Sequence, residues 1–117
     1  MMRTPCYQYD LGILESTLKS INKSVAGNSD WHVHYAIKAN ANPLILKLIN
    51  QYGLGIDCVS GGEIQVALDN GFKASSIVFA GVGKADWEIE TALDGGIFCF
   101  NVESVPEAEI INSIAGA

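Results

Sequence analysis

The chain has few basic residues, few cysteines and no long apolar run, and each shortage excludes a class of protein. Seven Lys and Arg stand against thirteen Asp and Glu in 117 residues, which gives a formal net charge of −6, and no basic cluster is present. Nucleic acid and anionic membrane surfaces are therefore not expected partners. No apolar run approaches the roughly 18 residues of a membrane-spanning helix, so no membrane association is expected.

The three cysteines are too few and too scattered for a disulfide framework or a CxxC metal site. They are Cys6, Cys58 and Cys99, and the last two lie in apolar segments, where cysteine behaves as a small apolar residue. His32 and His34 have no further ligands near them in sequence, so no metal site is expected. The first residues lack the apolar core of a signal peptide, which predicts a cytoplasmic protein.

Four short apolar runs recur at intervals of about 20 residues, a spacing typical of strand–helix units. The expected strands are 33–37, 55–59, 77–80 and 97–101. Because these runs are almost continuously apolar, they favour parallel strands that are covered on both faces. Each run is followed by a turn and an amphipathic segment with a helix-start signal; the signals, including one before the first run, are Asp10, Asn42 with Pro43, Ser60 with Glu63, Asp86, and Ser104 with Glu107.

Four consecutive strand–helix units predict an α/β fold with a parallel sheet, either an open doubly wound sheet or part of a barrel. A closed (β/α)8 barrel usually needs about 250 residues, and this chain has 117. No linker composition interrupts the chain, so residues 1–117 are expected to form a single domain.

Polar residues gather at the expected carboxyl ends of the strands, where α/β proteins place their sites. Lys38 follows an apolar strand directly, and a lysine in such a setting can lose its proton and attack a carbonyl. The alternative is a lysine that has simply reached water. Asp57 lies inside an apolar strand, where an ionised carboxylate is costly without a partner. Lys38 is its expected partner, and a purely structural ion pair is the alternative to catalysis.

Four segments in this order and spacing resemble the fold-type III pyridoxal-phosphate decarboxylases of basic amino acids. They are HYAIKANANP at 34–43, GLGIDCVSGGEI at 53–64, IVFAGVGK at 77–84 and FNVES at 100–104. The resemblance implies the N-terminal portion of a (β/α)8 TIM barrel of the alanine racemase-like type, with about four strand–helix units. Residues 1–117 would then be a partial domain.

The resemblance also implies roles for individual residues. Lys38 would hold pyridoxal 5′-phosphate as a Schiff base and later assist proton transfer. Asp57 would contact the cofactor region, and Glu63 would help to hold the lysine and neighbouring charges, although Glu63 fits a helix capping box equally well. Ala36 and Asn40 match positions that line the cofactor pocket. The implied reaction is decarboxylation of a small-molecule amino acid, with meso-2,6-diaminopimelate, which gives L-lysine, as the expected substrate.

Two alternatives stay open beside this reading. Decarboxylases of ornithine, arginine and carboxynorspermidine share the motif set, and a non-catalytic barrel that binds pyridoxal phosphate is the second alternative. Racemisation of alanine is disfavoured, because Asn42 and Pro43 replace the pattern that usually follows the racemase lysine. The resemblance places the phosphate grip in later barrel strands and substrate-binding groups in a second domain across a homodimer interface. The chain is therefore expected to be an N-terminal fragment that is inactive alone.

Overall fold

The computed structural model describes residues 2–116, which form two compact units that divide after Trp31. The first unit contains one helix, α1, at Leu11–Val25. Asp10 caps this helix, because its Oδ1 accepts the backbone N–H groups of Gly12 at 2.8 Å and Ile13 at 3.1 Å. The predicted cap is therefore confirmed. The expectation of a single domain stays a prediction.

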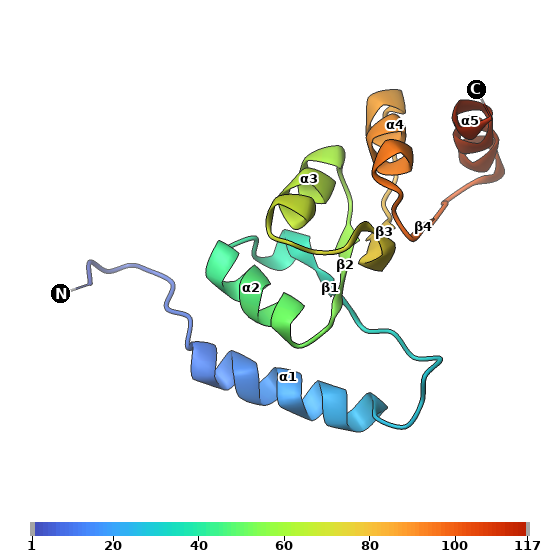
Figure 1. Cartoon of the computed structure of the whole chain (residues 1–117). Helices are drawn as coiled ribbons and strands as arrows, with labels where there is room; N and C mark the ends of the chain where they lie inside the picture. The colour runs from blue at the N-terminus through green and yellow to red at the C-terminus, as the bar shows by residue number, and fades with distance from the viewer. Residues whose placement is uncertain (1, 117) are drawn as a thin grey trace. The chain divides into compact units, whose positions relative to one another are not determined.

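A four-stranded parallel sheet forms the centre of the second unit, with strand order β1-β2-β3-β4 (Figure 1). The strands are β1 at His34–Ala36, β2 at Gly55–Cys58, β3 at Ile77–Phe79 and β4 at Cys99–Phe100. All four predicted strands are confirmed, and each is shorter than its apolar run. The α/β fold class with parallel strands is confirmed as well, and β1 and β4 are the edges of the sheet within residues 2–116.

Helices alternate with the strands along the second unit (Figure 1). They are α2 at Pro43–Gln51, α3 at Gly61–Asp69, α4 at Asp86–Gly95 and α5 at Val105–Ala115, with short 3-10 helices at Ile37–Ala39 and Ala74–Ser76. Right-handed crossovers between sequential strands place α2, α3 and α4 on one face of the sheet, and α5 packs beside α4. The core therefore lies between this face and the helices, and its fully buried members include Leu46, Ile56, Ile64, Ile77, Phe79 and Ile89.

Three of the four α-helices of the second unit begin with a side-chain cap. Asn42 accepts the N–H of Leu44 at 2.9 Å to start α2. Ser60 and Ser104 accept the N–H groups of the glutamates three residues later, so both predicted caps are confirmed. The glutamates do not complete the capping boxes, because they accept the N–H groups of Val59 and Glu103, one residue before each cap.

Helix α4 begins at Asp86, as the sequence predicts, and Asp86 occupies its first helical position. Its cap is supplied by Glu88, whose Oε2 accepts the N–H of Ala85 at 2.9 Å. A glutamate in the first turn thus satisfies backbone donors at the start of α3, α4 and α5.

Gly55 permits the close approach of β1 and the segment before β3, and this makes it a sensitive position. A Cβ added there would lie 2.5 Å from Cδ2 of His34 and 2.6 Å from the backbone oxygen of Ser76. Because a backbone oxygen cannot move aside cheaply, we expect Gly55→Ala to lower the free energy of unfolding by about 1–3 kcal/mol. Urea unfolding followed by circular dichroism measures this loss.

Gly62→Ala is the matched control for this prediction. A Cβ at Gly62 would meet nothing closer than the Oγ of Ser60 at 3.9 Å. Because Gly62 lies in the first turn of α3, alanine there should leave the urea midpoint unchanged or raise it. Equal midpoints for the two variants would contradict the assignment of Gly55 as a close-contact position.

Within residues 2–116, no helix combines the length and the apolar character that crossing a membrane requires.

Candidate functional site

Lys38 lies on a short turn immediately after the first strand. Strand β1 ends at Ala36, and the 3-10 helix at Ile37–Ala39 then presents the Lys38 side chain to solvent. Ile37 is only 1% exposed and anchors this turn in the core. The site lysine is thus an exposed amine on a backbone that its buried neighbour fixes.

Asn40 holds the far end of the same turn. Its backbone oxygen accepts the hydroxyl hydrogen bond of Tyr35 at 3.0 Å, which ties the turn back to β1. Its Oδ1 accepts the N–H of Asn42 at 2.9 Å, one step before the cap of α2. Asn40 therefore shapes the loop that carries Lys38, and its expected place in the lining of a cofactor pocket stays a prediction.

Ala36 and Asp57 lie side by side in the sheet. The strand register pairs Ala36 with Asp57, Asp57 with Val78, and Val78 with Cys99. Directly paired residues of neighbouring strands point to the same face, so these four form one row across the sheet. The residues on either side of Asp57 in β2 are fully buried and belong to the helix-covered face. The row therefore lies on the face opposite the helices. Within residues 2–116, helices cover only the other face of the sheet.

Asp57 carries a polar atom without a partner. Its Oδ1 is buried and accepts no hydrogen bond. The expected ion pair with Lys38 is not formed; the ion pairs within the described residues join Lys19 to Glu15 and Lys84 to Glu107. The prediction is wrong because β1 stops at Ala36, and the 3-10 turn that follows breaks the strand geometry which would have aligned the two side chains.

Glu63 is used as a helix cap. Its Oε2 accepts the N–H of Val59 at 2.6 Å, while its own N–H is donated to the Oγ of Ser60 at 3.1 Å. The carboxylates of Glu63 and Asp57 nevertheless both act on the thiol of Cys58. Burial, and then the charges of Glu63 and Asp57, raise the pKa of the Cys58 thiol to about 12. The two predicted acidic residues thus flank one buried, neutral thiol at the end of β2, and a role of Glu63 toward a cofactor stays a prediction.

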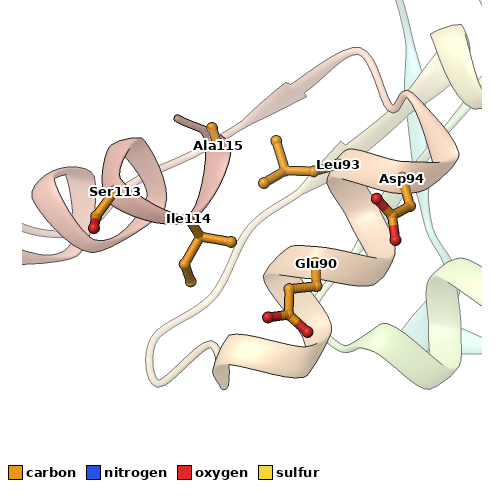
Figure 2. A pocket seen from close by; sticks show the side chains of 6 residues that line it. All are labelled: Glu90, Leu93, Asp94, Ser113, Ile114 and Ala115. Atoms are coloured by element: carbon orange, nitrogen blue, oxygen red, sulfur yellow. The ribbon is translucent and has the colours of Figure 1, made fainter. Parts of the chain in front are cut away.

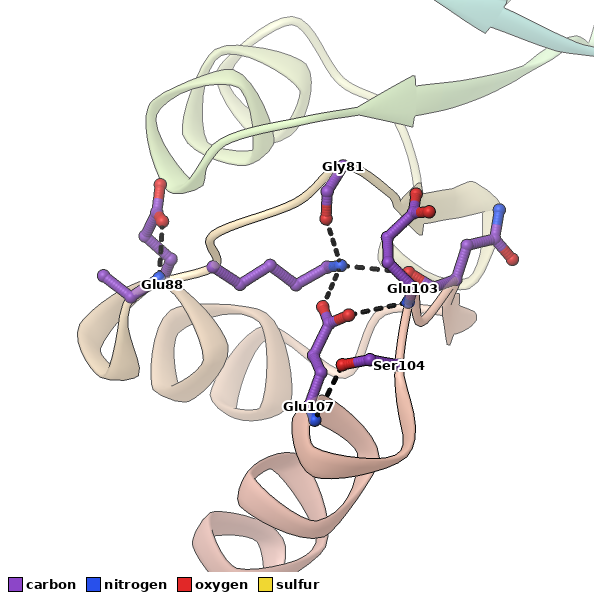
Figure 3. A network of polar contacts seen from close by, with 8 residues as sticks. Gly81, Glu88, Glu103, Ser104 and Glu107 are labelled. Atoms are coloured by element: carbon purple, nitrogen blue, oxygen red, sulfur yellow. Dashed lines mark hydrogen bonds and ion pairs between the residues drawn. The ribbon is translucent and has the colours of Figure 1, made fainter.

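Lys84 was not among the predicted site residues, but it is the centre of a buried polar network. It lies in the loop between β3 and α4, where a turn was expected after the third apolar run. The side chain is only 1% exposed, and its Nζ donates hydrogen bonds to the backbone oxygens of Gly81 at 2.6 Å and Asn101 at 2.9 Å and to the Oε1 of Glu107 (Figure 3). All three donors of the ammonium group are therefore satisfied, which accounts for a buried lysine.

The network around Lys84 predicts a pH dependence of stability. The backbone N–H of Glu103 and the ammonium of Lys84 both donate to the Glu107 carboxylate and hold its pKa below the usual range. Because the folded-state pKa lies below that of the unfolded chain, this contribution is complete above about pH 4.3 and is lost as pH falls through the folded-state value. We expect Glu107→Gln to weaken the fall of the urea midpoint between pH 5 and more acidic solutions. An unchanged pH profile would contradict this assignment.

A hollow of about 710 Å³ lies between α4 and α5, away from these residues (Figure 2). It is lined by Glu90, Leu93, Asp94, Ser113, Ile114 and Ala115. These residues come from the second half of each helix, whereas the carboxyl ends of the strands lead into the helix N-termini. The hollow is therefore at the opposite end of the unit from Lys38 and Asp57.

The residues at the carboxyl ends of β1 and β2 fit an aldehyde cofactor such as pyridoxal phosphate. An exposed primary amine at Lys38 can condense with an aldehyde. The buried Oδ1 of Asp57 is an acceptor that no group of the described chain uses, and a bound ligand can satisfy it. Its strand neighbour Ala36 has a small side chain that leaves room on the same face.

Comparison with known proteins agrees with this arrangement. Residues 11–117 match the family model of the pyridoxal-dependent decarboxylases, pyridoxal binding domain. A diaminopimelate decarboxylase of Bacteroides thetaiotaomicron is 59% identical over 99% of this chain and 30% of its own length. A crystal structure of diaminopimelate decarboxylase from Helicobacter pylori complexed with L-lysine has a TM-score of 0.88 and 43% identity, covering 98% of this chain and 29% of that one.

A more distant match shows the breadth of the fold. A crystal structure of ornithine decarboxylase from Entamoeba histolytica has a TM-score of 0.73 at 27% identity, covering 86% of this chain and 30% of that one. The chain thus spans about 30% of the length of the relatives that it matches, and its sheet is the equivalent of one part of these decarboxylases. The chain belongs to the family of pyridoxal-dependent decarboxylases and contains sequence of their pyridoxal-binding domain.

Proposed function

We propose that the protein carrying this chain is a pyridoxal-phosphate-dependent decarboxylase in which Lys38 attaches the cofactor. One observation carries the proposal: an exposed lysine follows β1 directly, and a buried, unpartnered carboxylate oxygen lies on the next strand. The family membership supports the same assignment. Bound pyridoxal phosphate supplies an electron sink for the electron pair that is left when carbon dioxide departs.

The residues of the chain have separate tasks in this proposal. Lys38 presents its amine to the cofactor aldehyde and, once released by the substrate, moves a proton at its Nζ. Asp57 accepts a hydrogen bond from the bound ligand at Oδ1, and Ala36 leaves space beside it. Glu63 caps α3 and would add negative charge to the cofactor site. Asn40 fixes the turn after the lysine and lines the pocket.

The proposed substrate is meso-2,6-diaminopimelate, and the proposed product is L-lysine. Support comes from the 59% identity to a relative named diaminopimelate decarboxylase, compared with 27% to an ornithine decarboxylase. The test is carbon dioxide release by the protein that carries this chain, with meso-diaminopimelate, L-ornithine and L-arginine offered separately. Release from diaminopimelate alone is the expected result. Preference for ornithine or arginine would move the protein to another member of the family, and bound cofactor without any release would favour the non-catalytic alternative.

Residues 1–117 alone are expected to release no measurable carbon dioxide, because they span only about 30% of the length of the relatives. The homodimeric state and the cytoplasmic location stay predictions. Sedimentation of the protein that carries this chain measures the first of them.

A further inference from the structure

We infer that Lys84 is a positioning residue that holds three successive loops at the carboxyl ends of β2, β3 and β4 as one unit. Its ammonium joins the loop after β3 to the loop after β4, since it donates to Gly81 on one side and to Asn101 and Glu107 on the other (Figure 3). The ring of Phe79, at the end of β3, lies 5.4 Å from the Nζ.

The same loop is tied to its other neighbour, the loop after β2. Gly81 lies close to Val59, because a Cβ added to Gly81 would lie 3.3 Å from the Cβ of Val59. Val59 in turn donates its N–H to the predicted site residue Glu63. We therefore expect a displacement of Gly81 to shift the segment between Asp57 and Glu63.

A second polar link runs parallel to the first. Glu88 accepts the N–H of Ala85 at Oε2, next to Lys84, and the N–H of Gly61 at Oε1 at 2.9 Å. Trp87 covers Gly61 so closely that an added Cβ would lie 2.7 Å from the Trp87 ring. The start of α4 thus bonds to the start of α3, and Lys84 bonds to the start of α5.

Together these contacts make a continuous chain from Glu107 through Lys84 and Gly81 to Val59 and Glu63. Within the described chain, the ammonium of Lys84 donates to Gly81, Asn101 and Glu107. None of these three is proposed to bind the cofactor, so Lys84 would act through the loop after β2. An effect of Lys84 on catalysis rests on the proposed function, whereas its effect on the position of Val59 and Glu63 does not.

The experiment is a comparison of backbone amide NMR spectra of the chain with those of three variants. Lys84→Met keeps the length of the side chain and removes the ammonium, and Glu107→Gln leaves one carbonyl oxygen to serve both Lys84 and Glu103. Lys73→Met is the matched control, because Lys73 is an exposed lysine in the loop before β3, at the other end of the strands.

The expected result is a set of shifted amide signals at Val59, Gly61 and Glu63, together with faster hydrogen exchange at Val59. The change should be largest for Lys84→Met, smaller for Glu107→Gln and absent for Lys73→Met. Should Lys84→Met fail to fold, Glu107→Gln against Lys73→Met decides the question. Changes confined to 81–84 and 101–107 would overturn the inference. Since the amides are read without cofactor, failure of the chain to bind pyridoxal phosphate would count against the proposed function and leave this result intact.

Discussion

Replacing Lys38 by alanine should abolish covalent capture of pyridoxal phosphate by the protein that carries this chain. The exposed Nζ is the proposed point of attachment, and alanine has no nucleophile to take its place. After incubation with the cofactor and reduction with borohydride, peptide mass mapping should find the label on Lys38 in the original protein and only background in the variant. Because Lys38 is exposed, its loss should change the free energy of unfolding by no more than about 0.5 kcal/mol.

Lys47→Ala provides the control for this measurement. Lys47 is another exposed lysine, on α2, and it follows Lys38 closely in the chain. Its replacement should leave the label on Lys38 unchanged. A label that persisted in Lys38→Ala, or one found on Lys47 in the original protein, would end the assignment of Lys38 as the attachment point.

Replacing Asp57 by valine should have opposite effects on stability and on cofactor binding. The buried Oδ1 has no partner, and such an atom costs about 1–3 kcal/mol. Valine suits a strand interior and fits beside Val78, so the variant should unfold at a higher urea concentration than the original chain. Cofactor capture at Lys38 should fall by about tenfold or more, because the acceptor that the ligand uses is gone.

Asp57→Asn separates charge from shape in the same position. It keeps a polar side chain of the same size, so it should lose cofactor capture without the gain in stability expected for valine. Loss of stability in both variants, with capture unchanged, would show that Asp57 serves the fold alone. A gain in stability together with a loss of capture is the signature of a residue retained for function.

The elements of the fold were predictable because their signals are local. Asp10, Asn42, Ser60 and Ser104 each bond to a backbone N–H within three residues, and the sequence spacing alone contains this information. The start of α4 at Asp86 was predicted as well, but two acidic residues, Asp86 and Glu88, lie in its first turn. Both are plausible from sequence, and only the backbone geometry decides which one reaches back to Ala85.

The polar contacts of the site were less predictable because their partners are far apart in the chain. Lys84 finds Asn101 and Glu107 at separations of 17 and 23 residues, and no local pattern indicates those meetings. The expected pair of Lys38 and Asp57 is absent because β1 stops at Ala36 and Lys38 lies on the 3-10 turn that follows. A sheet register can be inferred from periodicity, but the residue at which a strand stops depends on tertiary packing.

The glutamates that begin α3, α4 and α5 have a consequence for how an anionic ligand can lie in this part of the molecule. A helix N-terminus is ordinarily a favourable binding site for phosphate, because its unpaired N–H groups and dipole carry partial positive charge. In this chain the carboxylates of Glu63, Glu88 and Glu107 already accept backbone N–H groups at the starts of α3, α4 and α5. Their negative charge offsets the partial positive charge of these helix ends. A phosphate group with two negative charges would be repelled by the glutamate carboxylate at each of these helix starts. The phosphate of a cofactor attached at Lys38, as proposed, would therefore gain little from the starts of these three helices.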